Sequence, residues 1–465
     1  MAYYFVPDQL ALWSTALSGV AFYGLIFIGP IGIYINRNIV SWHREYEMTK
    51  IMLFHFFYVF FIGLISIPPF YIFSKSLDID EPLLTEFLIL IVPLIFTFQV
   101  LFISYQSYLN IFGENKEFFF ATILMSFMVL ILPLGFILVF GQNLFQWGGG
   151  YLLANLIGVI ISLFYLSDIF KSSKKKNIFL FNFKLLKNSA TFILPALIVA
   201  IFSWISIHFY KYGFIVLGFK LEEISFLIIG LTLSHSLFSA VEQVLTSIYS
   251  SVYLRRVSSN PEKADEYWSD TIIGFIPILM IFTWFYFSVA EYLPSILLND
   301  SYNSIYNYLL VGGIIEFCRI LLNLTYLRTQ GINKTYLMLK PYALSFIICF
   351  IVLIFFYYLN FLNLIFLSLL MAVMSFISFS LIIFYIPKQI ILKILKNLKF
   401  FFITSVFLLA VCFFIKEILV SLEIPRIVII FFLFMFWAIY GLYAFLNDKK
   451  INTLDFSIEK EAIKK

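Results

Sequence analysis

Residues 118–140 read FFFATILMSFMVLILPLGFILVF and contain no charged side chain. As an α-helix, about 20 such residues cross the hydrocarbon core of a bilayer. Inside the bilayer no water can satisfy backbone N–H and C=O groups, so such a stretch must be helical. Similar stretches fill the chain, and together they lie at 9–35, 51–74, 84–111, 118–140, 147–169, 190–218, 224–253, 269–292, 303–327, 335–358, 362–386, 400–420 and 426–446. The sequence therefore predicts an all-α integral membrane protein with about 13 transmembrane helices.

The basic residues mark one side of the membrane. Of the 31 Lys and Arg residues, 25 lie at alternate gaps between the apolar stretches, the C-terminal tail included. Loops rich in Lys and Arg stay in the cytoplasm, so the chain is predicted to start outside and to end in the cytoplasm. The net charge of +5 follows from this sidedness. We interpret the run 174–176 as an orientation signal that touches anionic lipid, and we expect no nucleic-acid partner.

The gaps between the stretches are too short to fold as catalytic domains. The longest gap, 170–189, is a short basic linker. The sequence has no Gly-rich phosphate loop and no His/Cys cluster with metal-ligand spacing, and the three cysteines lie in apolar stretches. We expect no enzyme, no cofactor and no metal site, and a transporter is the default class for so many helices with so little outside them.

Two nine-residue segments indicate an internal repeat. YLNIFGENK at 108–116 and YLRTQGINK at 326–334 share the pattern Y-L-x-x-x-G-x-N-K. Both end a predicted helix on the basic side, six helices apart. A Gly just past a helix end is a natural left-handed cap, which we expect for Gly113 and Gly331. Two unrelated turns could share this chemistry, but duplication also explains the common side. Parallel repeats place a substrate path between two lobes.

The repeat predicts two lobes of the six-helix type. Residues 1–170 would form the first lobe with five helices, and 171–189 a basic cytoplasmic linker. Residues 190–386 would form the second lobe with six helices, and 387–465 would add two helices and a basic tail. The first lobe then lacks its first helix, and we interpret the chain as a fourteen-helix design whose first helix is absent here.

Two of the apolar stretches carry a polar stripe along one helical face, with steps of three or four residues. The stripe in 224–253 consists of Thr232, His235, Ser239, Glu242, Thr246, Ser250 and Tyr253, and the stripe in 303–327 of Gly312, Glu316, Arg319, Asn323 and Tyr326. An ionised side chain at mid-bilayer costs roughly 2.5–3.5 kcal/mol and usually faces a cavity or a partner.

The stripes allow both structural and functional interpretations. The Ser and Thr hydroxyls alone fit hydrogen bonds between helices. Glu316 and Arg319 form either a structural ion pair at i, i+3 or a functional site. Glu242 has no obvious local partner, so we predict that it lines a cavity together with His235.

Three basic residues elsewhere are further candidates. His208 and Lys211 lie on the outer part of the stretch 190–218, where we expect Lys211 to extend outward to water. Arg37 ends the first apolar stretch. It is either a topology charge or a group that collects phosphate at the mouth of a cavity.

At several segments the chain resembles the polysaccharide flippases of the multidrug/oligosaccharidyl-lipid/polysaccharide exporter superfamily. The likeness lies in YYFVPDQLALW at 3–13, in Arg37, in HFYKYGFIVLGFKLEE at 208–223 and in the two repeat segments. It implies a MATE-like fold of two lobes around a cation-lined cavity. It also implies a bacterial inner-membrane protein that carries a polyprenyl-diphosphate-linked oligosaccharide to the outer leaflet, for O-antigen, capsule or exopolysaccharide synthesis.

On this resemblance we assign hypothetical roles to the polar residues. Contacts to the substrate would come from Arg37, His208, Lys211, Arg319 and Asn323, and proton or cation coupling would use His235, Glu242 and Glu316. A polysaccharide polymerase and chain-length proteins would be the protein partners. The alternatives are a cation-coupled antiporter of drugs or metabolites with the same fold, a membrane-embedded polysaccharide polymerase, and a scaffold for a synthesis complex. The short outside gaps disfavour the polymerase.

Overall fold

A computed structural model of the chain describes residues 5, 7–45, 48–76, 82–172, 183–208, 210–211, 219, 221–298, 300–332, 334–359, 363–422 and 424–447. For some of these residues, Arg37 among them, only the backbone is described. All regular elements in this part of the chain are helices. The prediction of an all-α fold is therefore confirmed.

The described helices account for the predicted membrane spans. Eleven of them are long and apolar enough to cross a membrane, and two shorter apolar helices cover 193–205 and 426–441. Each of the thirteen predicted stretches overlaps one of these helices. The stretch 190–218 is described as helix only to His208 and again at 210–211.

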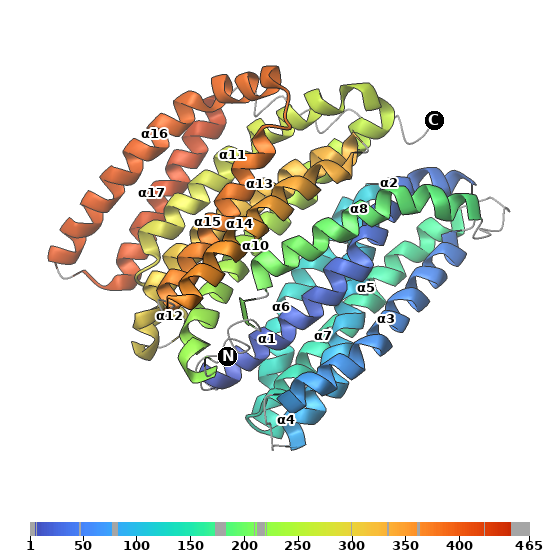
Figure 1. The fold of residues 1–465 in the computed structure, drawn as a ribbon, viewed down its shortest axis with the longest axis horizontal. Helices are drawn as coiled ribbons and strands as arrows, with labels where there is room; N and C mark the ends of the chain where they lie inside the picture. The colour runs from blue at the N-terminus through green and yellow to red at the C-terminus, as the bar shows by residue number, and fades with distance from the viewer. Residues whose placement is uncertain are drawn as a thin grey trace. The chain divides into compact units, whose positions relative to one another are not determined.

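The helices divide into two compact units between Ser225 and Phe226. Figure 1 shows the first unit from blue to green and the second from green to red. The first unit contains α1 (Pro7–Tyr23), η1 (Gly24–Ile28), α2 (Gly29–Glu45), α3 (Met48–Ser76), α4 (Pro82–Glu86), η2 (Phe87–Ile91), α5 (Val92–Phe112), α6 (Asn115–Phe140), α7 (Leu144–Ser172) and α8 (Phe183–His208).

Two wide helical turns in the first unit have a common cause. η1 and η2 are π-turns, in which Gly29 N–H donates to Gly24 O and Val92 N–H donates to Phe87 O. In each case the donor directly precedes a proline, Pro30 or Pro93. A proline ring clashes with the carbonyl four residues earlier, and widening the preceding turn relieves the clash. The elements α1–η1–α2 and α4–η2–α5 therefore run on as continuous helices.

The second unit contains α10 (Leu221–Ser259), η3 (Pro261–Lys263), α11 (Ala264–Val289), α12 (Leu293–Leu297), η4 (Asp300–Ile305), α13 (Tyr306–Gly331), η5 (Thr335–Met338), α14 (Leu339–Tyr358), α15 (Leu364–Ile383), α16 (Lys388–Ser421) and α17 (Arg426–Asn447). In this unit α11 packs against α13, α16 and α17. Cys412, Leu433 and Trp437 form part of an apolar core beside Val289.

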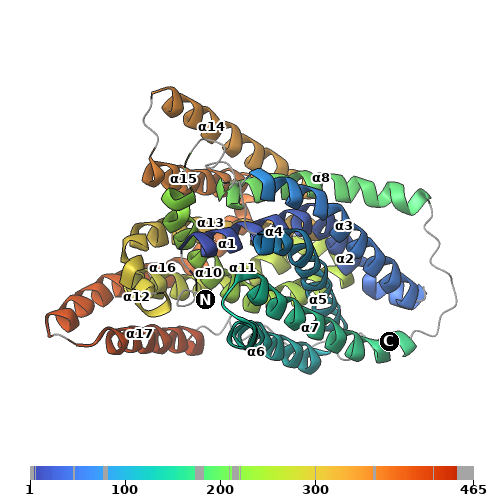
Figure 2. The same ribbon diagram turned by 90° about the horizontal axis from the view of Figure 1, so that it is seen from below.

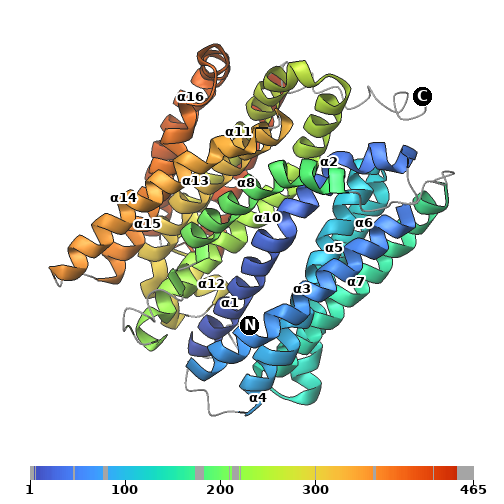
Figure 3. The same cartoon turned by 45° about the vertical axis from the view of Figure 1, so that its right-hand side comes forward.

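Helices with the predicted six-helix offset pack in the same order in both units. In the first unit α7 lies against α5 and α6, and α3 against α5 (Figure 3). In the second unit α15 lies against α13 and α14, and α11 lies against α13; Figure 2 shows α14 beside α15. This order supports the duplication inferred from the two nine-residue segments, although the lobe boundaries derived from it stay a prediction.

The two repeat glycines do different things. Gly113 caps α5 in the left-handed region, at φ 85°, as predicted. The prediction for Gly331 is wrong, because α13 continues through Gly331 and its cap is Ile332 at φ −85°. A Cβ on Gly331 would collide with the Tyr253 hydroxyl of α10. Gly331 is thus needed for close helix approach, and Gly113 for a positive φ.

α8 groups with the helices that precede it in the chain. It packs against α1, η1 and α2, and the division into units falls after it. The repeat predicts instead that the stretch 190–218 opens the second lobe. In this structure its hydrophobic face is buried against the first unit.

Candidate functional site

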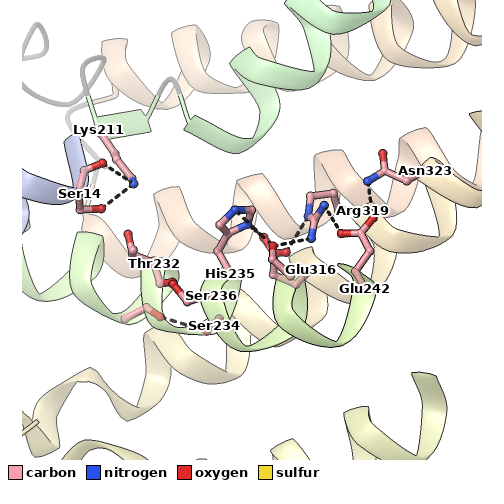
Figure 4. Close-up of polar contacts among 12 residues, drawn as sticks. Ser14, Lys211, Thr232, Ser234, His235, Ser236, Glu242, Glu316, Arg319 and Asn323 are labelled. Atoms are coloured by element: carbon pink, nitrogen blue, oxygen red, sulfur yellow. Dashed lines mark hydrogen bonds and ion pairs between the residues drawn. The ribbon is translucent and has the colours of Figure 1, made fainter. Parts of the chain in front are cut away.

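The polar stripes of α10 and α13 face each other within the second unit (Figure 4). Arg319 of α13 lies between two carboxylates. Its Nε is 2.6 Å from Glu316 Oε2, one turn away, and its Nη1 is 2.7 Å from Glu242 Oε2 on α10. The pair Glu316–Arg319 has the i, i+3 geometry that the sequence predicted. The second carboxylate comes from the other helix, so the guanidinium joins α10 to α13.

His235 and Asn323 complete this ion cluster, which we define as His235, Glu242, Glu316, Arg319 and Asn323. His235 Nδ1 lies 3.0 Å from Glu316 Oε1. An ionised carboxylate only accepts hydrogen bonds, so Nδ1 carries the proton. Asn323 Nδ2 donates to Glu242 Oε1 over 2.7 Å. Each carboxylate therefore has both oxygens satisfied, one by Arg319 and one by a second side chain.

Ser239 closes the arrangement on the His235 side. Arg319 Nη2 donates to Ser239 Oγ over 3.2 Å, and Ser239 Oγ lies 3.4 Å from His235 Nε2. With neutral His235, the Ser239 hydroxyl can donate to Nε2. With protonated His235, the direction reverses and Nε2–H donates to Ser239. The geometry accommodates both protonation states of the imidazole.

The charges of the ion cluster do not cancel while His235 is neutral. One guanidinium faces two carboxylates, which leaves one net negative charge in a nearly dry site. The side chains of Glu316, Arg319 and Glu242 are 4%, 9% and 12% exposed, whereas that of His235 is 33% exposed. An uncompensated charge at this depth is costly. A proton on His235, or a bound monovalent cation, would neutralise the cluster.

Small residues bring α10 and α13 together beside the ion cluster. A Cβ on Gly312 of α13 would collide with Ser234 of α10. Ser234 Oγ lies 3.0 Å from Gly230 O and 3.2 Å from Leu309 O, and its one proton can be donated to either carbonyl. The Tyr286 hydroxyl lies 2.7 Å from Ser234 Oγ. Tyr286 of α11 in turn donates to Leu309 O over 2.9 Å. These contacts hold the helix pair in register, so the polar stripes meet.

A second buried ion pair lies near the end of α13. Arg328 Nε and Nη2 donate to the two carboxylate oxygens of Asp265 on α11, over 2.7 and 3.2 Å. Arg328 Nη1 donates to Tyr385 O over 3.3 Å, and the guanidinium carbon lies 5.8 Å from the centre of the Trp268 ring. In the sequence, Arg328 is one of the basic residues at the alternate gaps, which predict only the orientation of the chain. Its pairing with Asp265 could not be predicted from the sequence, because the two residues lie on different helices.

In the first unit Lys211 is buried, which corrects the expectation that it extends outward to water. Its Nζ donates to Ser14 Oγ over 2.7 Å and to Ser14 O over 3.2 Å. Trp204 of α8 donates from Nε1 to Ser18 O over 2.9 Å, so a second bond reaches the same face of α1. Hydroxyl and carbonyl groups of α1 thus replace the water that a snorkelling lysine would seek.

The predicted site residues fall in different places. His235, Glu242, Glu316, Arg319 and Asn323 meet in the second unit. His208 is buried near Lys211 in the first unit, with its ring 6.3 Å from that of Trp204. Arg37 lies in α2, and its side chain is outside the described part of the chain. The prediction that Glu242 lacks a partner is wrong, because Arg319 and Asn323 both bind it.

No protein-family model matches the sequence, and no curated protein sequence matches it. Solved structures do match. The chain is similar to a eukaryotic MATE transporter, AtDTX14, with a TM-score of 0.61 and 13% identity over 84% of this chain and 90% of that one. The fold is that of the MATE transporters. This confirms the predicted MATE-like architecture.

Two conformational states of this fold match the chain to a similar degree. A multidrug resistance MATE family transporter of the MOP superfamily in its outward-facing conformation has a TM-score of 0.57 and 14% identity, over 84% of this chain and 89% of that one. An inward-facing conformation of such a transporter has a TM-score of 0.54 and 13% identity, over 83% and 91%. At such identities the likeness shows the fold, and it assigns no substrate.

Proposed function

We propose that the chain carries a polyprenyl-diphosphate-linked oligosaccharide from the cytoplasmic to the outer leaflet of a bacterial inner membrane, by alternating access. The observation that carries the transport proposal is the ion cluster. Five polar side chains converge between two largely apolar helices, which could pack through apolar side chains alone. Buried charges in membrane helices commonly mark substrate or ion pathways. The substrate class follows from the resemblance at 3–13, Arg37, 108–116, 208–223 and 326–334.

The two units would have different roles, with substrate binding in the first unit and ion coupling in the second. In the first unit Arg37, His208 and Lys211 are the proposed partners of the diphosphate, because cationic groups bind phosphate oxygens. In the second unit His235, Glu242 and Glu316 are proposed for coupling to a proton or a monovalent cation. Arg319 and Asn323, which we expected to contact the substrate, both hold Glu242. A phosphate at Arg319 would have to compete with the two carboxylates that already bind its guanidinium.

The net negative charge of the ion cluster favours a second candidate, a cation-coupled antiporter. A site with two carboxylates and one guanidinium attracts a cation more readily than a diphosphate. The MATE fold is shared with solved multidrug transporters. On this alternative the exported molecule would be a drug or metabolite, and the cluster would exchange it for a proton or a metal cation.

Reconstituted vesicles separate the two candidates. We would load vesicles containing the full-length protein with a fluorescent polyprenyl-diphosphate oligosaccharide and follow its exposure to a membrane-impermeant quencher. The same vesicles would be tested for uptake of a cationic dye. The flippase proposal expects lipid exposure with little dye uptake. Dye uptake without lipid exposure would support the antiporter. If neither the lipid nor the dye is transferred, both proposed functions are rejected.

Two Glu variants make the vesicle test specific. Glu242→Gln alters the ion cluster, whereas Glu262→Gln changes an exposed carboxylate in η3, outside the cluster. Transport should fall in Glu242→Gln and remain in Glu262→Gln. Equal activity in both variants would show that transport does not depend on the ion cluster.

A further inference from the structure

α16 is longer than a membrane span requires. Its 34 residues extend over about 51 Å at about 1.5 Å per residue, against about 30 Å for the hydrocarbon core. The apolar part that can cross the membrane is Phe401–Ser421. The preceding part, Lys388–Phe400, therefore continues the same helix beyond the hydrocarbon, on the side where the basic residues of the chain gather.

One face of this extension is fixed to α11. Lys393 Nζ donates to Asp270 Oδ1 over 2.8 Å and to Ser269 Oγ over 2.9 Å. Leu398, five residues further along the helix, is buried. These contacts orient the extension, so the direction of its opposite face is set by packing within the second unit.

The opposite face combines exposed lysines with exposed leucines, and we name it the lysine–leucine face: Lys388, Leu392, Leu395, Lys396 and Lys399. At about 100° per residue, these five side chains lie within about 100° of the helix circumference and so share one face. Leu392 and Leu395 are 56% and 60% exposed. The three lysines are exposed, and within the described part of the chain no ion pair or hydrogen bond of their ammonium groups is found.

This face continues directly into the lipid-facing side of the span. Phe402 and Ile403, on the same face of the helix, are more than half exposed. From 388 to 416 the chain contains no acidic residue. A cationic, partly apolar surface beside a membrane span complements phosphate headgroups with attached acyl chains. We propose that the lysine–leucine face of α16 binds anionic phospholipid, with the lysines on headgroup phosphates and the leucines against the acyl chains.

Phospholipid fits the whole lysine–leucine face better than a protein partner does. A protein partner would need a surface that ends at the lipid boundary, whereas phospholipid is present along the whole face from Lys388 to Ile403. The substrate that we propose for transport is itself a phosphate-bearing lipid, so the same chemistry could come from it. The experiment must therefore distinguish membrane phospholipid from polyprenyl diphosphate.

The test uses the full-length protein in phosphatidylcholine vesicles that contain photoactivatable phosphatidylglycerol. After irradiation, the labelled peptides are identified by mass spectrometry. We expect labelling within 388–403, suppressed by high salt because charge attraction is screened. In the triple variant Lys388→Gln, Lys396→Gln, Lys399→Gln, labelling should be about tenfold lower than in the parent protein. The reason is that each lysine near an anionic surface contributes to the attraction. The Lys→Arg triple variant, which keeps the charges, should retain it.

The matched control changes three other exposed lysines of the same unit, Lys263, Lys334 and Lys340, to Gln. This variant should label like the parent. Equal loss in both triple variants would mean attraction by net charge alone and would overturn the proposal, as would labelling that the α16 variant leaves unchanged. Unlabelled phosphatidylglycerol should compete with the probe. Displacement by polyprenyl diphosphate at a far lower concentration would assign the face to the substrate and reject phospholipid.

Discussion

Glu242 of α10 and Arg319 of α13 form an ion pair across two membrane helices, with 2.7 Å between Oε2 and Nη1. The pair matters because it is not local in the sequence. Arg319 already has a partner one turn away in Glu316, at 2.6 Å. Adding a second carboxylate gives the site an excess negative charge, and His235 is its most exposed ionisable member.

Removing Arg319 should separate folding from transport. Arg319→Ala leaves Glu242 and Glu316 facing each other without a guanidinium, and breaking a buried pair costs about 3–5 kcal/mol. We expect a lower melting temperature in detergent and no transport. Adding Glu242→Gln should bring the melting temperature most of the way back to that of the parent protein. It removes one of the two unpaired carboxylates, and the other, Glu316, keeps its contact with His235. Transport should stay absent, and its return in the double variant would make the cluster purely structural.

Glu242→Gln should remove coupling with little loss of stability. The Gln side chain can accept from Arg319, and Asn323 can turn its amide to accept from the Gln nitrogen. The free energy of unfolding should change by about 1 kcal/mol or less. The ion cluster is then neutral without a proton or cation, so transport should lose its dependence on the proton or sodium gradient. A gradient response identical to that of the Glu262→Gln control would contradict this.

Gly331→Ala should destabilise the second unit. Its Cβ would overlap the Tyr253 hydroxyl, with the Tyr253 ring carbon Cζ only 2.7 Å away. Overpacking of this kind costs about 1–3 kcal/mol. Tyr253→Phe removes the nearest atom and gives up only a weak 3.4 Å hydrogen bond to Arg328 O. The melting temperatures of the two single variants and the double variant form a cycle, and simple additivity would show that the two residues do not meet.

Two aspartates of α11 should respond differently to the same substitution. Asp265 binds Arg328, which is 4% exposed, whereas Asp270 binds Lys393, which is 42% exposed. Asp265→Asn leaves a buried guanidinium without its carboxylate, and we expect a loss of about 2–3 kcal/mol, reduced from the fully buried case because Asp265 is partly exposed. Asp270→Asn should cost less than about 1 kcal/mol. Melting temperatures of the two variants measure the contrast, and equal losses would show that burial of the cation is unimportant.

Much of the fold was accessible from local sequence patterns. Apolar runs such as 118–140 placed the helices, because a bilayer leaves backbone polar groups no other partners. The shared segments 108–116 and 326–334 indicated two similar helix sets, and the packing of α7 and α15 follows that order. Gly331 was misinterpreted as a cap because Gly serves two purposes, positive φ and close approach, which the sequence does not distinguish.

The candidate site was predictable only in part. Spacing by three and four residues put Glu316 beside Arg319 and Glu242 on the same face as His235. Spacing within a helix says nothing about which neighbouring helix faces that side. The partners Asn323, for Glu242, and Ser14, for Lys211, therefore required the packed structure.

By itself, the sequence determined that this protein lies in a lipid bilayer, where its helices are, and on which helical faces its charges lie. Hydropathy and helical periodicity are properties of neighbouring residues, so a local pattern is enough to find them. Tertiary structure alone decided that Arg319 binds two carboxylates, that Lys211 is buried against α1, and that the two repeat glycines differ. These outcomes depend on how closely helices approach and in which register. Such quantities arise from the packing of many side chains together and leave no local pattern in the chain.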